Sequence, residues 1–304
     1  MQIAHGDEAP VFKDVGGVRG GKVDKQILLT GDPTSPGNFK FGLFGQHADF
    51  YSPRHRHNFC QFRVQISGVC DYAANGKMTP GTVAFMPEGV YYGPQGPDVG
   101  ESYTATVQFG GPSGQGYVTL EQKNVAKAEL DKLGVFEKGV FRRNPDVPGK
   151  RNMDGFEAVW EQAMGRPLIY PDAQYGMPVL MHPENFEWLP VAGADGLEIK
   201  TLGSFTDCQI PCATWRLQPG ASLTAKGRGI YMVLSGQGVL QDGEFRRFTS
   251  VYLDTGETAR FKAREVSEIL LLGLPDVAEL RTYSPPTAAV ERQLLDRAMG
   301  DVED

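Results

Sequence analysis

The chain has 304 residues, which predicts about two domains at roughly 150 residues each. Lys and Arg number 30 against 37 Asp and Glu, so the formal charge is −7, which argues against a nucleic-acid-binding surface. Glycine (38) and proline (21) together exceed ordinary usage and indicate many turns. With 10% aromatic residues to build a core, this composition predicts a mainly β protein of sandwiches or barrels.

The cysteines and the hydropathy bear on compartment and partners. No pair of cysteines has the CxxC spacing of a zinc ribbon, and all four are expected to be reduced core thiols: Cys60, Cys70, Cys208 and Cys212. The first residues lack the basic start and apolar run of a signal peptide, and no apolar stretch reaches 18 residues. We therefore expect a cytoplasmic protein with no membrane partner.

In chain order, residues 1–40 are turn-rich, and residues 39–109 alternate as short strands broken by Gly, Pro and Asn. Asn75-Gly76 is typical of a two-residue β-hairpin turn. Residues 118–137 have apolar positions near helical spacing, and 153–165 form a second, shorter helical candidate. Strand patterns resume over about 188–274, and an amphipathic helix is expected at the C-terminus.

An internal repeat decides the domain organisation. Residues 63–89 align with 231–256, so that Gly68 falls on Gly236 and Asn75-Gly76 falls on Asp242-Gly243. A chance alignment of two β-meanders is the alternative explanation. Because both the Ser-Gly pair and the hairpin dipeptides match, we expect two copies of one β-domain with a helical segment between them.

The first repeat contains the candidate metal-ligating and catalytic residues. His55-Arg56-His57 puts two imidazoles on one face of an extended strand, because side chains alternate with period two. Two neighbouring imidazoles form half of a site for Fe, Ni, Zn or Mn. Gln61, Gly68 and the segment Gly81-x5-Pro87-x-Gly89-x-x-Tyr92 follow at fixed spacing.

This pattern resembles the cupin superfamily, whose motifs are G-x5-HxH-x3,4-E-x6-G and G-x5-PxG-x2-H-x3-N. The resemblance implies a bicupin, mainly β, of two jelly-roll barrel domains with a helical insertion between them and a C-terminal helix. The expected boundaries are an N-terminal cupin domain at 1–117, a helical or loop connection at 118–187, a degenerate C-terminal cupin domain at 188–283, and a terminal helix at 284–304. It also implies a divalent metal ion (Fe, Ni or Zn), a small-molecule substrate and a homodimer.

The chain departs from the family pattern at its ligand positions. Gln61 stands in the glutamate position, Tyr92 in that of the second-motif histidine, and Asp49 in that of the leading glycine. The resemblance therefore implies His55, His57 and Gln61 as metal ligands, with His47 or Tyr92 as a further donor. Two imidazoles alone bind weakly, so a metal-free pocket is the alternative. Tyr92 could equally bind substrate or fill space.

Strand parity extends the site. If His55 and His57 face the barrel interior, then Gln61, Arg63 and Gln65 do so too, and the intervening residues from Cys60 to Ile66 form an outer apolar face. A buried Arg63 is costly without an anionic partner. That partner is either a carboxylate of a substrate or one of the protein, or else Arg63 lies at a solvated barrel mouth.

In the second repeat the equivalents of His55 and His57 are Leu223 and Ala225, and Ala259 stands at the position of Tyr92. Since none of these can bind a metal, we expect the second domain to be structural.

Three functions follow. The first is a metal-dependent dioxygenase that cleaves a carbon–carbon bond in a small enolic or aromatic substrate, with Tyr92, Gln61 and Arg63 as catalytic or substrate-binding residues. The second is an isomerase, lyase or cyclase in which His57 or Tyr92 moves protons. The third is a binding protein without catalytic activity.

Overall fold

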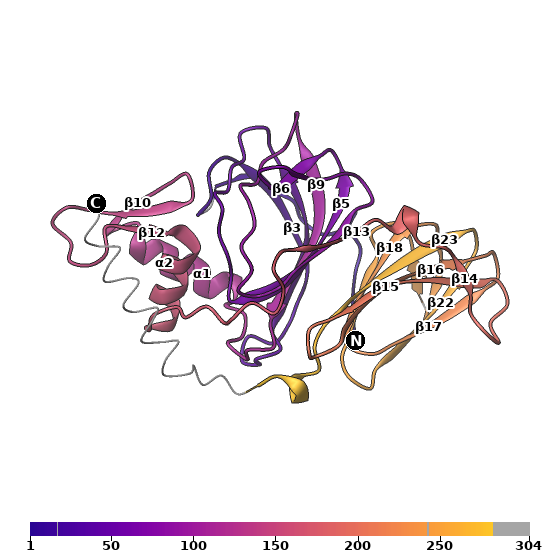
Figure 1. Ribbon diagram of the computed structural model, residues 1–304. Helices are drawn as coiled ribbons and strands as arrows, with labels where there is room; N and C mark the ends of the chain where they lie inside the picture. The colour runs from indigo at the N-terminus through magenta and orange to yellow at the C-terminus, as the bar shows by residue number, and fades with distance from the viewer. Residues whose placement is uncertain (17, 242, 282–304) are drawn as a thin grey trace.

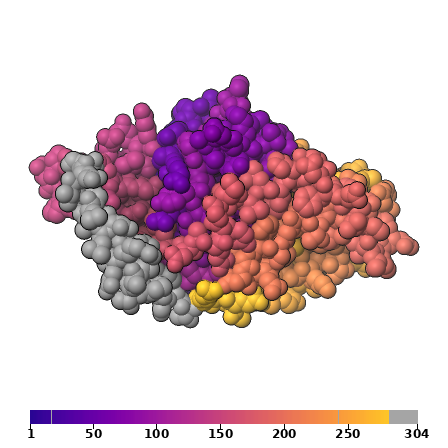
Figure 2. All heavy atoms as spheres, viewed as in Figure 1, coloured from indigo at the N-terminus to yellow at the C-terminus, as the bar shows by residue number. Residues whose placement is uncertain are grey.

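The computed structural model describes residues 1–16, 18–241 and 243–281 (Figure 1). It contains two β-barrels side by side and a helical insertion at the far side of the first barrel from the second. The space-filling view shows the same order, with the first barrel between the insertion and the second barrel (Figure 2). The prediction of a mainly β chain with two jelly-roll domains is confirmed.

The first barrel is built on a seven-stranded antiparallel sheet. Its spatial order is β13 (Val179–Met181), β8 (Val83–Met86), β5 (Phe59–Ser67), β9 (Ser102–Gly110), β4 (Phe39–Gln46), β3 (Val23–Thr30) and β2 (Phe12–Val15). The opposite wall has one short hairpin, β6 (Cys70–Ala73) and β7 (Gly76–Met78). Its turn lies at Ala74 and Asn75, one residue before the predicted Asn75-Gly76 pair.

The second barrel repeats this topology. Its large sheet has the order β1 (Gln2–Ala4), β21 (Ser250–Leu253), β18 (Gly229–Ser235), β23 (Ser267–Gly273), β16 (Ile210–Leu217), β15 (Leu197–Phe205) and β14 (Leu189–Pro190). Its opposite wall is a four-stranded sheet of β17 (Ser222–Lys226), β22 (Thr258–Ala263), β19 (Gly238–Leu240) and β20 (Gly243–Phe245). Strand for strand, β5 to β8 correspond to β18 to β21, which is the repeat that the sequence contains.

The two barrels exchange their edge strands. Strand β1 precedes the first barrel in the chain but pairs with β21 of the second. Strand β13 immediately precedes the second barrel but pairs with β8 of the first. Residues 2–4 and 179–181 therefore lie in a different sheet from the one that the expected boundaries, 1–117 and 118–187, assign to them.

A shared apolar core joins the barrels. It combines outward residues of the first large sheet, such as Phe62 and Phe85, with Phe205, Ile210 and Leu272 of the second. The rings of Phe85 and Phe205 stack with centroids 4.6 Å apart. Cys60 and Val64 belong to this core, so the predicted outer apolar face of β5 is confirmed.

The connecting segment holds more than helices. Helix α1 spans Leu120–Leu130 and begins with a capping box between Thr119 and Gln122. Three short strands follow, β10 (Gly134–Glu137), β11 (Val140–Arg143) and β12 (Asn152–Asp154). The helix predicted over 118–137 thus stops early, because Gly134 enters a close β-pair in which a Cβ would lie 2.2 Å from the Arg142 carbonyl oxygen.

Helix α2 (Gly155–Met164) closes the insertion. Asp154 caps its N-terminus by accepting from the backbone amides of Phe156 and Glu157, and Gly165 ends it in the left-handed region at φ 62°. Two 3₁₀ turns complete the elements, Pro183–Asn185 and Val277–Glu279. The predicted C-terminal helix at 284–304 and the predicted turn residue Asp242 lie outside the described residues. No helix among those described has the length and apolar character needed to cross a membrane.

Candidate functional site

The inner face of the first large sheet is polar. On β5, Gln61, Arg63 and Gln65 face the barrel interior and alternate with apolar residues that face outward, as the strand parity predicts. Strands β4 and β9 alternate in the same way and add Lys40 and Gln108, whose Cα positions face each other across the ladder. The second barrel differs, because its interior is filled by an apolar core that includes Leu223, Ala225 and Ala259. The polar side chains that could do chemistry inside a barrel therefore lie in the first one.

His55 and His57 enter this interior from the opposite wall. The HxH segment was expected on a regular strand, but it is irregular and is held by a single bridge between His55 and Tyr92. Both rings are nevertheless buried, and their centroids lie 4.8 Å apart. The ring of His57 stacks on Phe59 at 4.3 Å and contacts Phe156 of α2 at 4.7 Å, so the insertion covers this end of the barrel.

A chain of hydrogen bonds crosses the barrel to His57. It runs from the Lys123 amine to the Tyr117 hydroxyl (2.8 Å), then to Gln108 Oε1 (2.7 Å), Gln61 Oε1 (3.1 Å), Tyr92 Oη (3.1 Å) and His57 Nδ1 (3.0 Å). Every link uses a side chain of a different element. Gln61 and Tyr92 are almost fully buried, at 1% and 3% exposure, so the chain satisfies polar groups that water does not reach.

The direction of this chain favours one tautomer of His57. Because the amide nitrogen of Gln61 donates to Tyr92 Oη, the single hydroxyl proton of Tyr92 is free to point to His57 Nδ1. His57 Nδ1 is then the acceptor, and the ring proton sits on Nε2.

His55 adopts the opposite tautomer. Its Nδ1 lies 2.6 Å from the carbonyl oxygen of Pro53, which can only accept, so Nδ1 carries the proton and Nε2 has the lone pair. The two neighbouring imidazoles therefore present different groups. His55 offers a base at Nε2 and His57 offers an N–H.

Burial keeps these groups neutral. It is the main cause that lowers the pKa of His55 to about 3 and the pKa of His57 well below its ordinary value, and the positive charges of Arg19 and Arg63 act in the same direction. Burial also raises the pKa of Tyr92 to about 12, so its hydroxyl keeps its proton. At neutral pH the site holds two neutral imidazoles and a neutral phenol.

Arg63 is the one residue with two unpartnered side-chain polar atoms among the buried groups of the described chain, where five other residues have one each. It is 8% exposed, and its Nε and Nη1 atoms have no hydrogen-bond partner. No carboxylate of residues 1–281, as far as they are described, forms an ion pair with it. Since a buried charge without a partner is costly, this guanidinium has the properties of a binding group for an anion.

The donor atoms do not fit a divalent metal ion in this arrangement. Only His55 Nε2 presents a free lone pair, because His57 Nδ1 already accepts from Tyr92 and its Nε2 is protonated. Gln61 turns its nitrogen, not its oxygen, toward Tyr92. Among the described residues, no carboxylate contacts the two rings. Besides burial, the positive charges of Arg19, Lys123 and Arg63 lower the pKa of His57. The metal-ligand roles expected for His55, His57, Gln61 and Tyr92 stay predictions, and they require other tautomers than the ones described above.

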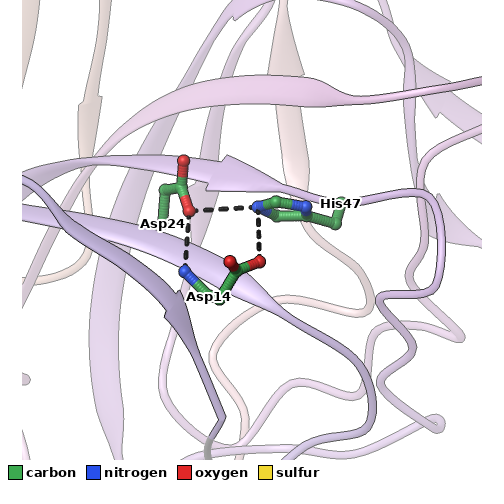
Figure 3. A group of neighbouring side chains, drawn as sticks. All are labelled: Asp14, Asp24 and His47. Atoms are coloured by element: carbon green, nitrogen blue, oxygen red, sulfur yellow. Dashed lines mark hydrogen bonds and ion pairs between the residues drawn. The ribbon is translucent and has the colours of Figure 1, made fainter.

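His47 lies elsewhere. Its ring lies between the carboxylates of Asp14 and Asp24 (Figure 3). The Nε2 atom is 3.0 Å from Asp24 Oδ1 and 3.9 Å from Asp14 Oδ1. These three side chains form the one His/Cys/Asp/Glu cluster of metal-ligating size in the described part of the chain. Lys13 and Lys22 already pair with its two carboxylates, so the cluster is a balanced ion-pair network. His47 therefore does not supply a third ring to His55 and His57.

The comparisons with known proteins identify the fold. No family model and no curated protein matches this chain by sequence. By structure it is similar to a candidate dioxygenase from Nostoc punctiforme, with a TM-score of 0.59, 11% identity, and coverage of 94% of this chain and 87% of that one. The chain has the bicupin fold.

Two further solved structures resemble this bicupin. Oxalate decarboxylase from Bacillus subtilis matches with a TM-score of 0.52 and 13% identity over 91% of this chain and 76% of its own. Quercetin 2,3-dioxygenase from Acinetobacter baumannii matches with a TM-score of 0.50 and 13% identity over 100% of this chain and 98% of its own. At such identities the likeness concerns the fold, and the reaction has to be argued from the site.

A second cavity lies between the two barrels of the bicupin. It has a volume of about 630 Å³ and is lined in part by Gln65, Trp188, Lys200 and Arg216. Two of its basic groups already have partners, since Arg216 pairs with Glu268 at 2.9 Å and Lys200 donates to the Pro183 carbonyl at 2.6 Å. A third, Arg247, lies over the ring of Phe248 at 4.5 Å.

Sequence reasoning missed part of the site. Gln108 and Lys40 could have been found, because each is a polar residue between apolar ones on a strand with a buried outer face. Tyr117 and Lys123 carry no such signal, since they reach the barrel only through the path of the insertion.

The pKa of His55 predicts a pH-dependent stability. A pKa lowered to about 3 means that the unfolded chain binds the proton first, so stability is full above about pH 6.5 and falls as the pH drops toward 3. Over this window we expect His55 alone to account for a loss on the order of 4 kcal/mol. Denaturant unfolding from pH 7 to 4 measures it. His55→Gln should flatten the profile, and the same change at the exposed His182 should not. An unchanged profile in His55→Gln would show that the ring is not buried as a neutral base.

Proposed function

We propose that the first barrel is the active site of an enzyme that moves protons on a small organic anion. The observation that carries this proposal is the buried Arg63 guanidinium with two unpartnered nitrogens, on the same inner face as Gln61 and near Tyr92. A carboxylate or an enolate would supply the missing partner through paired hydrogen bonds. The reaction class is therefore that of an isomerase or lyase.

The two imidazoles provide a base and an acid. His55 Nε2 takes a proton from a carbon next to the anionic group of the substrate, and Arg63 stabilises the enolate that develops. His57 returns a proton from Nε2 while Tyr92 transfers its own to His57 Nδ1. The substrate loses one proton to His55 and gains one from His57, and the starting state returns when the proton on His55 passes to the Tyr92 phenolate through solvent. Gln61 donates to the Tyr92 oxygen and stabilises the phenolate that forms.

Binding of the anion also adjusts the base. The positive charge of Arg63 contributes to the low pKa of His55 and of His57. An anion on Arg63 cancels this charge, so both pKa values rise when substrate is bound. The base thus becomes stronger in the complex than in the free protein.

Proton abstraction can be measured without knowing the natural substrate. We expect the protein to catalyse deuterium exchange from D₂O at the carbon beside the carboxylate or carbonyl of 2-oxo acids and 3-oxo acids, followed by proton NMR. Tyr92→Phe and His55→Gln should each slow the exchange by about 10²-fold or more. Arg63→Leu should raise the substrate concentration required, and Arg142→Leu on the exposed insertion is its control. Exchange that survives in His55→Gln would contradict the assignment of the base.

A metal-dependent dioxygenase is the second candidate. It is favoured by the two adjacent imidazoles and by the likeness to the Nostoc punctiforme candidate dioxygenase. It requires that Tyr92 release His57 Nδ1, or that the ring protons move, before two lone pairs can meet at one ion. A binding protein without catalysis is the third, and it shares the anion site at Arg63. The homodimer and the cytoplasmic location stay predictions.

Metal analysis separates the first two candidates. After reconstitution with Fe(II), Ni(II) or Zn(II) and desalting, we expect substoichiometric metal in the protein, and the same amount in the His55→Ala/His57→Ala double variant. The reason is the single free lone pair in the present arrangement. One ion per chain that is lost in the double variant would contradict the metal-free proposal and favour the metal-dependent candidate instead.

A further inference from the structure

Three lysines converge on the inner side of the first barrel. Lys25 comes from β3, Lys40 from β4 and Lys123 from α1, and all three are half-buried. Lys25 is paired across the ladder with Phe44, and the Lys40 amine lies 5.5 Å from the centroid of the same Phe44 ring. Residues from three elements thus bring positive charge to one place.

Lys123 is tied to the same place from the insertion. Its amine donates to the Tyr117 hydroxyl, and that hydroxyl donates to Gln108, which faces Lys40 across the ladder. The amine also lies over the rings of Tyr117 at 4.1 Å and Phe59 at 5.6 Å. Aromatic faces stabilise a cation but leave its remaining N–H groups without an anionic acceptor.

The lysine charges are not neutralised within the described residues. None of the three amines forms an ion pair with a carboxylate there, whereas Lys13, Lys77, Lys127 and Lys132 on the surface all do. Burial lowers the pKa of Lys25, of Lys40 to about 8, and of Lys123. The charge of Lys25 further lowers that of Lys40, and both neighbours further lower that of Lys123. The cluster is therefore destabilising as it stands, which is common where a site is prepared for a ligand.

We infer that Lys25, Lys40 and Lys123 form a second anion site in the first barrel, which holds a further carboxylate or phosphate group of the ligand that Arg63 binds. This inference rests on the proposed function for the idea that one ligand reaches both sites. Gln61 is two strands from Lys40 in the same row of the sheet, and Arg63 is two residues further along β5. The two sites are thus separated by roughly 12 Å at the backbone, and less between the side chains that meet over the sheet. A small dianion with a polar middle matches this separation.

Thermal unfolding with inorganic phosphate and with acetate tests the lysine site apart from Arg63. At millimolar concentration, against chloride of equal ionic strength, we expect one of the two probes to raise the Tm by about 3 °C. A larger shift with phosphate assigns a phosphate group, and a larger shift with acetate assigns a carboxylate. The shift should shrink in Lys25→Gln/Lys40→Gln, persist in part in Arg63→Leu, and stay unchanged in Lys226→Gln, an exposed lysine of the second barrel.

A second signature distinguishes binding from a merely structural role. In chloride alone, Lys25→Gln/Lys40→Gln should melt at a higher temperature than the wild type, because it removes like charges that repel each other. If the double variant does not fold, the single Lys40→Gln variant is measured in its place. No shift in the wild type with either probe, or a shift of undiminished size in the lysine variants, would overturn the lysine site. A shift lost only in Arg63→Leu would overturn it as well while leaving the proposed function standing.

Discussion

Polar groups buried inside a barrel have to find partners, and most of what distinguishes the first barrel from the second follows from this constraint. The second barrel avoids the problem by filling its interior with apolar side chains such as Leu223 and Phe261. The first barrel solves it with one continuous chain of donors and acceptors from Lys123 to His57. Because each inner member accepts from one neighbour and donates to the next, the chain has a direction, and this direction favours a proton on Nε2 of His57.

The architecture keeps this chain in register. Gln61 and Gln108 sit on adjacent central strands of a sheet whose outer face is locked into the core shared by both barrels. The exchange of β1 and β13 ties each barrel to a segment of chain that precedes the other. On the opposite side, Phe156 of α2 covers the ring of His57 and excludes solvent from that end. The second barrel thus contributes rigidity to a site in which it has no side chain.

Sequence alone predicts the fold and about half of the site. The repeat with Asn75-Gly76, and the alternation of apolar and polar residues around Arg63, depend on local patterns that the fold preserves. The spacing of His55 and His57 identifies them as site residues. It does not predict their protonation, which depends on the hydrogen bond of His55 to the Pro53 carbonyl and on the Tyr92 hydroxyl, 35 residues after His57. His47 is misleading for the opposite reason. It is close in sequence to the motif, yet its ring turns to Asp24, whose pKa is lowered chiefly by the Lys13 hydrogen bond.

Lys25, Lys40 and Lys123 show most clearly what the sequence alone does not predict. Lys25 and Lys40 lie on strands with readable patterns, whereas Lys123 reaches them only because the insertion folds back over the barrel. No spacing rule connects residue 123 to residue 40, so the concentration of positive charge is a property of the tertiary structure. The same holds for the isolation of Arg63, which is defined by the carboxylates that are absent around it in the described chain.

The proposed acid–base chemistry depends on two neighbouring imidazoles, His55 and His57, that hold their protons on opposite nitrogens. Long-range ¹H–¹⁵N correlation spectra of protein labelled at histidine, with His55→Gln and His57→Gln for assignment, report the tautomer of each ring directly. We predict a protonated Nδ1 on His55 and a protonated Nε2 on His57, both neutral at pH 7. A spectrum in which both rings carry the proton on Nδ1, so that two lone pairs face one another as a metal pair would require, would contradict it.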